Sequence, residues 1–148
     1  MTPARFVATL GGAGLLRPGP GTWGSAVVLP FVLLGPLACL MLALAVTLAG
    51  YWAAQQVLRD DTEDPGWFVA DEGAGMLLAL AALPVATWTG VLAAFALFRL
   101  LDIAKPWPVS WADRQAGAFG VMLDDVLAGA LAAAALQALH MAIPGVLG

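Results

Sequence analysis

Residues 120–129, G-V-M-L-D-D-V-L-A-G, set the architecture of this chain because they place two adjacent carboxylates at the start of a long apolar segment. The segment continues with A-L-A-A-A-A-L-Q-A, and small side chains let helices approach closely. We therefore predict a closely packed, central helix here. If it begins at Asp124, that residue is an ordinary N-cap. If it begins near Gly120, both carboxylates lie inside an apolar helix, where ionisable groups indicate function; the sequence leaves both starts open.

The composition of the whole chain is that of a membrane protein. Of its 148 residues 61% are hydrophobic and 11% are charged, whereas ordinary soluble domains are roughly 45–50% apolar. A soluble protein of this size has too little interior to bury so much apolar surface. The length suits one domain, residues 1–148. The net charge of -4 argues against a nucleic-acid partner, which needs a basic surface.

The charged residues are confined to a few short stretches. Ranges 18–58 and 73–98 contain none, and 126–148 contains only His140. Because a crossing takes about 20 residues, range 18–58 is long enough for two passes, with a break at Pro30 to Pro36. Range 73–98 is ample for one tilted crossing but short for two, and Pro84 near its middle is a kink or a turn. We expect a re-entrant or shallow hairpin, which would return 99–125 to the side of 59–72.

Backbone that is broken at membrane depth must be covered by protein or line a polar cavity. We therefore predict an all-α fold, a compact multi-helix membrane-embedded bundle with broken or re-entrant helices. The acidic run at 59–64, R-D-D-T-E-D, is interpreted as a solvated surface loop.

A glycine- and proline-rich loop, L-L-R-P-G-P-G-T-W-G-S at 15–25, precedes the first apolar segment. Backbone N–H groups at a helix start favour anions, and Arg17, Thr22 and Ser25 could donate further hydrogen bonds to a phosphate. The alternative is a membrane-entry turn in which Thr22 or Ser25 is the N-cap. Taken alone, the loop fits the turn better.

Two further motifs contain acids, and the second of them also contains bases. In V-A-D-E-G-A-G-M, Asp71 and Glu72 open an apolar helix, and the helix dipole accounts for one of them. In F-R-L-L-D-I-A-K-P-W-P, Arg99 and Asp102 share a helical face, and the prolines end the helix beside Lys105. An ion pair and a snorkelling lysine explain why these residue types occur. They do not explain why so many charged residues lie within one short stretch.

Carboxylates fall into three clusters, Asp71/Glu72, Asp102/Asp113 and Asp124/Asp125. If the clusters converged, they would repel one another unless a cation held them together. Their donors are oxygen atoms only, with no histidine or cysteine nearby, so Mg²⁺ is the expected cofactor and Mn²⁺ the next.

The four motifs resemble, in order and spacing, those of phosphatidylglycerophosphatase A. The resemblance rests on P-G-T-W-G-S, D-E-G-A-G, F-R-L-L-D-I-A-K-P-W-P and M-L-D-D-V-L-A-G, and covers roughly residues 15–130. It implies an Mg²⁺-dependent, multi-pass enzyme of the bacterial inner membrane with its active site facing the cytoplasm. Such an enzyme hydrolyses the phosphate monoester of phosphatidylglycerophosphate to phosphatidylglycerol and inorganic phosphate. Soluble relatives of the family are all-α.

The resemblance nominates six catalytic residues, and five of them, all except the lysine, as metal ligands: Asp71, Glu72, Asp102, Lys105, Asp124 and Asp125. It also places the 20–25 loop at the phosphate. Polar or basic residues near these motifs are the substrate-binding candidates, together with one loop glycine: Arg17, Thr22, Gly24, Ser25, Arg99 and Arg114. The chain departs from the family at Ala70, where a bulky residue is more usual, and at Ala118, where a second glycine is expected.

Other phosphatase designs lack their residues here. No arginine follows Cys39 at C-x₅-R spacing, no DxDx motif is present, and there is one histidine. We expect the carboxylates to hold one or two Mg²⁺ ions against the phosphate while water attacks phosphorus in line with the leaving glycerol oxygen; a covalent aspartyl-phosphate stays open. Two alternatives remain: a non-enzymatic transporter or channel component, and a metal-dependent phosphatase of another lipid phosphate or diphosphate.

Overall fold

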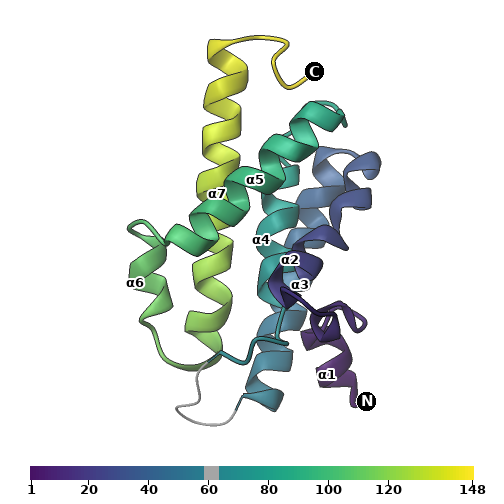
Figure 1. The fold of residues 1–148 in the computed structure, drawn as a ribbon, viewed down its shortest axis with the longest axis vertical. Helices are drawn as coiled ribbons and strands as arrows, with labels where there is room; N and C mark the ends of the chain where they lie inside the picture. The colour runs from purple at the N-terminus through teal and green to yellow at the C-terminus, as the bar shows by residue number, and fades with distance from the viewer. Residues whose placement is uncertain (59–63) are drawn as a thin grey trace.

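The computed structural model describes residues 1–58 and 64–148, and these form helices and loops without any strand (Figure 1). In chain order the helices are α1 (Pro3–Ala8), the 3₁₀ helix η1 (Ala13–Leu15), α2 (Pro20–Ala26), the 3₁₀ helix η2 (Leu29–Leu34), α3 (Pro36–Val57), α4 (Ala70–Leu80), α5 (Trp88–Ala104), α6 (Val109–Asp113) and α7 (Gly117–Ala142). The all-α class and the compact bundle are confirmed.

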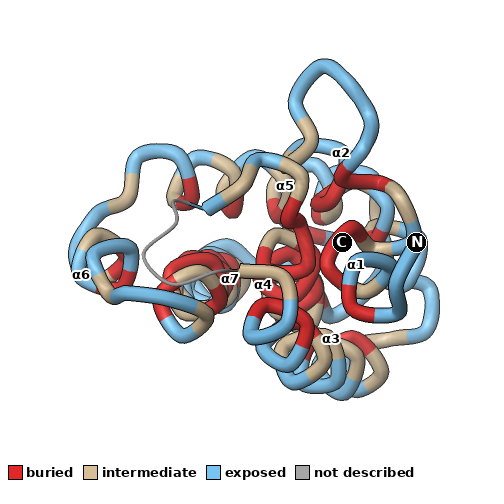
Figure 2. Tube along the Cα trace, turned by 90° about the horizontal axis from the view of Figure 1, so that it is seen from below, coloured by how far each residue is buried: buried red, intermediate tan, exposed pale blue. Residues whose placement is uncertain are grey.

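Helix α4 is the centre of the bundle. Nine of its eleven residues are buried, and it packs against α2, α3, α5 and α7. Seen from below, α3 and α5 lie on opposite sides of α4 (Figure 2). The expected central helix, α7, is closely packed as predicted, but residues such as Ala134 and Ala135 on one of its faces are exposed. Helix α4 is the central helix because it is short, and the helices around it cover it on every side.

Helices α4 and α7 cross through glycines. A Cβ on Gly129 would lie 2.3 Å from the carbonyl oxygen of Gly75, and one on Gly75 would lie 2.3 Å from that of Asp125. The two backbones therefore touch, which only residues without a side chain permit. Asp71 precedes Gly75 by four residues and Asp125 precedes Gly129 by four, so each carboxylate is one turn from the crossing. The crossing thus brings carboxylates from distant segments together.

Range 18–58 is long enough for two membrane-spanning helices, but it does not form two. Only α3 has spanning length, whereas residues 20–34 form the short helices α2 and η2. The reason is local: Gly19 has the left-handed φ of 68°, Gly35 has a φ of 93°, and Pro30 lies at the start of η2. These residues interrupt a continuous α-helix.

The predicted hairpin between 73 and 98 is present. Helix α4 ends at Leu80, a turn containing Pro84 follows, and Thr87 caps α5 by accepting a hydrogen bond from the Gly90 N–H at 3.0 Å. Helix α5 then runs back diagonally across the bundle (Figure 1). Its last turn, which carries Asp102, therefore lies near Glu72 in the first turn of α4.

The two possible starts of the last long helix are also resolved. Helix α7 begins at Gly117, so Asp124 and Asp125 lie in its interior and neither is an N-cap. Both residues are buried. Ionisable side chains inside an apolar helix require partners, and the site supplies them.

The exterior of the bundle is apolar. Helices α3 and α7 are long and apolar enough to cross a membrane by length and composition. Along α3 the buried residues are mostly small, such as Cys39, Ala43 and Gly50, while Leu37 and Leu48 are 71% and 62% exposed. Large side chains that point outward and small ones that point inward match helices packed within lipid.

The tight crossing predicts a specific loss of stability. Gly129→Val should lower the free energy of unfolding by about 1–3 kcal/mol because the new side chain must push α4 away. Ala130→Val, on an exposed neighbouring position, should change it by less than about 0.5 kcal/mol. Thermal unfolding in detergent, followed by circular dichroism, measures both. Equal melting temperatures for the two variants would contradict a close backbone contact.

Candidate active site

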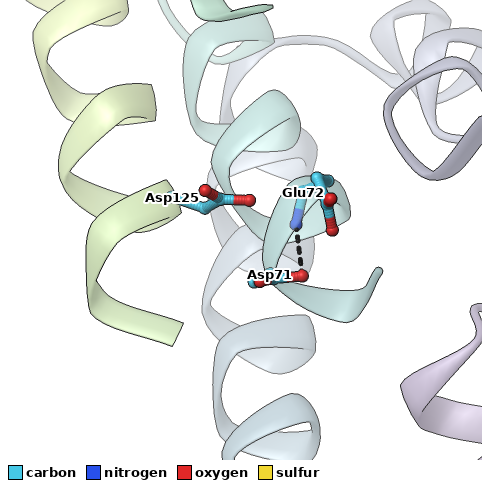
Figure 3. A group of neighbouring side chains, drawn as sticks. All are labelled: Asp71, Glu72 and Asp125. Carbon is cyan, nitrogen blue, oxygen red and sulfur yellow. Dashed lines mark hydrogen bonds between the residues drawn. The ribbon is translucent and has the colours of Figure 1, made fainter. Parts of the chain in front are cut away.

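Three carboxylates from two helices meet at the α4–α7 crossing. Asp71 and Glu72 come from the first turn of α4, and Asp125 points toward them from α7 (Figure 3). One oxygen of each lies within 4.8 Å of the others. Asp71 and Asp125 are buried and Glu72 is half-buried. Convergence of the acidic clusters, which the sequence suggested on electrostatic grounds, is therefore present for these residues.

The acids of this trio have few protein partners. Asp71 Oδ1 accepts the Glu72 N–H at 3.0 Å, whereas Glu72 Oε2 is buried without any hydrogen-bond partner among the described residues. Burial raises the pKa of the Asp71 carboxyl well above its usual range, and the neighbouring carboxylates of Glu72 and Asp125 raise it further. Buried acids of like charge are stable in ionised form only beside a cation. An all-oxygen donor set with an unpartnered atom fits a hard divalent ion.

Asp102 and Arg99 close the site from α5. Asp102, in the last turn of α5, neighbours Glu72 and Asp125 and forms an ion pair with Arg99. The Arg99 guanidinium also lies beside Gly21 of α2, where an added Cβ would be 3.3 Å from Nη1 and 2.6 Å from Glu72 Oε1. The start of α2 thus packs directly on the acidic trio. Gly21 was not named individually among the predicted site residues, although it belongs to the 20–25 loop that the resemblance places at the phosphate.

Lys105 organises a second group of charges. It lies just after α5 in a left-handed conformation, with a φ of 49°, and Pro106 follows it. Its Nζ lies 2.9 Å from Asp124 Oδ2 and 3.1 Å from Asp113 Oδ1. Although burial opposes the charge, these two carboxylates raise the pKa of Lys105 above its usual value. The lysine is therefore protonated.

Asp124 and Asp125 have different partners because adjacent helical residues point about 100° apart. Asp125 faces α4 and the carboxylate trio, whereas Asp124 faces Lys105. The structure thus gathers all six nominated residues. Asp71, Glu72 and Asp125 form the trio, Asp102 pairs with Arg99, and Lys105 pairs with Asp124.

Besides Arg99, which lies in the site, the substrate-binding candidates divide into two groups. Arg17, Thr22 and Arg114 are exposed, and neither arginine forms an ion pair with the residues that the structure describes. Ser25 and Gly24 are buried in α2: the Ser25 hydroxyl donates to the Gly21 carbonyl oxygen at 3.0 Å, and an added Cβ on Gly24 would meet Val69. Gly19 is the N-cap of α2, so neither Thr22 nor Ser25 has that role.

The acidic run 59–64 lies mostly outside the described residues, and Asp64 is its described member. Asp64 is exposed, as expected for a surface loop. Loss of hydration, together with the carboxylates of Glu72 and Asp124, nevertheless raises the pKa of Asp64 to about 7. The residue therefore lies at the rim of the acidic site. No pattern in R-D-D-T-E-D distinguishes this aspartate from its neighbours.

Clustered carboxylates beside an arginine and a lysine are the groups that metal-assisted phosphoryl transfer uses. Here they lie inside a helical bundle whose exterior is apolar. Such an arrangement is expected of a phosphatase that acts on a lipid.

The family model of phosphatidylglycerophosphatase A matches residues 6–140. The chain belongs to the phosphatidylglycerophosphatase A family and is a phosphatase. Phosphatidylglycerophosphatase A of Haemophilus influenzae is 40% identical over 135 residues, which cover 86% of this chain and 83% of the relative. The Escherichia coli protein of the same name is 38% identical, covering 90% and 81%.

A third relative has a different name. The putative phosphatidylinositol-3-phosphatase of Bacteroides thetaiotaomicron is 38% identical over 135 residues, covering 84% of this chain and 85% of the relative. No solved structure matches the chain.

The contact between Lys105 and Asp124 predicts an asymmetric response to mutation. Lys105→Met should lower the free energy of unfolding by about 1–3 kcal/mol because it leaves Asp124 Oδ2 buried without its cationic partner. Asp113→Asn, which removes the exposed partner, should cost less than about 1 kcal/mol. Combining Lys105→Met with Asp124→Asn should recover part of the loss in a double-mutant cycle of thermal unfolding. Additive losses would mean that the pair does not interact.

Proposed function

We propose that this phosphatase hydrolyses the phosphate monoester of phosphatidylglycerophosphate to phosphatidylglycerol and inorganic phosphate, with Mg²⁺ as its cofactor. The observation that carries the proposal is the converged trio of Asp71, Glu72 and Asp125 in a chain of this family. The names of the Haemophilus and Escherichia relatives support the substrate.

The metal would be held by Asp71, Glu72 and Asp125, with Asp102 close enough to complete the set. The unpartnered Glu72 Oε2 is the atom that most needs a cation. A bound divalent ion supplies positive charge for phosphate oxygens and lowers the pKa of water. Asp124 belongs to the candidate ligands by sequence, but its contact with Lys105 favours a role in holding that lysine in place.

The basic residues would bind the phosphate. Arg99 offers a planar fork for two phosphate oxygens, and Asp102 orients it from one turn away. Lys105 adds a compact positive charge that Asp113 and Asp124 direct. Together they would offset the negative charge that builds up on phosphorus oxygens during in-line displacement.

The apolar surface supports a location in the bacterial inner membrane. In this arrangement α3 and α7 would cross the bilayer, and the α4–α5 hairpin would enter and leave on one side. The site lies toward the end of the bundle where α4 begins (Figure 1). We propose that this end faces the cytoplasm, so that the headgroup reaches the acids while the acyl chains stay among apolar helices.

A second candidate substrate is a different phospholipid monoester. The name of the Bacteroides relative, with 38% identity, favours this class. The carboxylates and bases described here recognise a phosphate monoester and its charge, so the same chemistry serves either lipid. Family membership gives no support to the non-enzymatic transporter.

Phosphate release tests the proposal directly. Detergent-dispersed phosphatidylglycerophosphate should be hydrolysed with Mg²⁺ and not with a chelator, and Asp125→Asn should reduce kcat/KM by about 100-fold or more because a metal ligand is lost. Asp113→Asn, the same chemical change at an exposed acid, should reduce it only a few-fold.

Two results would count against parts of this proposal. Release that is unaffected by both the chelator and Asp125→Asn would contradict the metal site. Equal kcat/KM for phosphatidylinositol 3-phosphate would leave the chemistry in place and contradict the choice of substrate.

A further inference from the structure

An apolar groove of about 530 Å³ lies between the α2–η2 segment and the start of α5. It is lined by Ala26, Leu29, Pro30, Val32, Leu33, Ala86, Thr87, Trp88 and Val91. The volume is within the range of small-molecule sites. Its one polar side chain, Thr87, is already engaged, because its hydroxyl donates to the Leu147 carbonyl oxygen at 2.7 Å and accepts the Gly90 N–H. The groove therefore suits a hydrocarbon ligand.

Both walls of the groove continue into the candidate active site. One wall is α2, which runs from Ala26 in the groove to Gly21 against Glu72 and Arg99. The other is α5, on which Val91, Phe95 and Arg99 follow at four-residue spacing and so share one face. Val91 and Arg99 are about 12 Å apart along the helix axis. This is less than the roughly 15 Å of one leaflet's hydrocarbon layer.

We propose that this groove binds an acyl chain of the lipid whose phosphate is held at Asp71, Glu72 and Asp125. The inference rests on the proposed function and deepens it, since it assigns the part of the site that recognises the lipid tail. The phosphate lies by Arg99, and the chain extends between α2 and α5 toward Trp88. Trp88 and Leu33, 85% and 77% exposed, form the open mouth of the groove on the surface.

The remaining apolar grooves do not share this position. Those of about 370 and 420 Å³ are lined by α3, α4 and α7 with residues such as Leu40 and Leu78. Helix α3, which lines both of them, lies on the opposite side of α4 from α5 (Figure 2). None of their lining residues belongs to α2 or α5, so a chain bound there does not lead to Arg99.

A groove that holds the tail makes catalytic efficiency depend on chain length. Ala26→Trp and Ala86→Trp each place a large ring in the groove, and neither residue belongs to the acidic site. With dipalmitoyl phosphatidylglycerophosphate in mixed micelles, each variant should lose about tenfold in kcat/KM. With the dihexanoyl substrate, Ala86→Trp should stay within about twofold of the unsubstituted protein, because Ala86 precedes α5 and lies beyond Val91, where six-carbon tails do not reach.

Ala134→Trp is the matched control because Ala134 lines a groove on the α3 side. It should leave both kcat/KM values unchanged, and thermal unfolding should show that all three variants remain folded. Equal effects of Ala26→Trp and Ala134→Trp, or equal losses of Ala86→Trp on both substrates, would overturn the acyl-chain assignment. So would a loss that accompanies dissociation of an oligomer in light scattering, since the groove would then be an interface between copies.

The same assay separates this inference from the proposed function. An unsubstituted protein that hydrolyses neither substrate with Mg²⁺ present contradicts the proposed function. An unsubstituted protein that hydrolyses the dipalmitoyl substrate, together with groove variants that do so equally well, contradicts only the acyl-chain groove.

Discussion

The contact between Gly75 of α4 and Gly129 of α7 governs the arrangement of this molecule. The two backbones meet without intervening side chains, which places the preceding turns of both helices side by side. Asp71 and Asp125 occupy those turns, so the close approach of the two helices also brings these two carboxylates close together. Dispersion contacts between small residues, and not a preformed polar attraction, therefore bring like charges together in an apolar interior.

Because the clustered carboxylates carry like charge, the groups around them must supply positive charge. Acids that are buried near one another are costly unless positive charge accompanies them. The protein supplies part of that charge itself, through Arg99 beside Asp102 and Lys105 between Asp113 and Asp124. The trio that includes Glu72 has no such partner among the described residues and leaves one oxygen without a hydrogen bond. The proposed metal would supply the positive charge that this trio lacks.

The apolar exterior and the polar interior are two consequences of one sequence pattern. Charged residues occur only in short stretches, and the bundle gathers most of those stretches at one end while α3 and α7 provide length and lipid-compatible surface. The break between α4 and α5 allows this, because it returns Arg99 and Lys105 to the first turn of α4. The groove beside α2 and α5 then joins the polar end to the apolar surface.

Composition and the distribution of charge were sufficient to predict an all-α bundle, the hairpin near Pro84 and the clusters of acids from which the trio is formed, because burial of apolar runs and clustering of charge are local properties of a chain. The roles of individual site residues came from the family resemblance. The partner of each carboxylate could not be predicted from neighbouring residues in the sequence. That Asp125 faces Asp71 while Asp124 faces Lys105 follows from the rotation of α7 about its axis, and this is set by the packing of Gly129 on Gly75. Likewise, the approach of Gly21 to Glu72 and the short helices before α3 depend on how distant segments pack, since steric contact between them exists only in the folded chain.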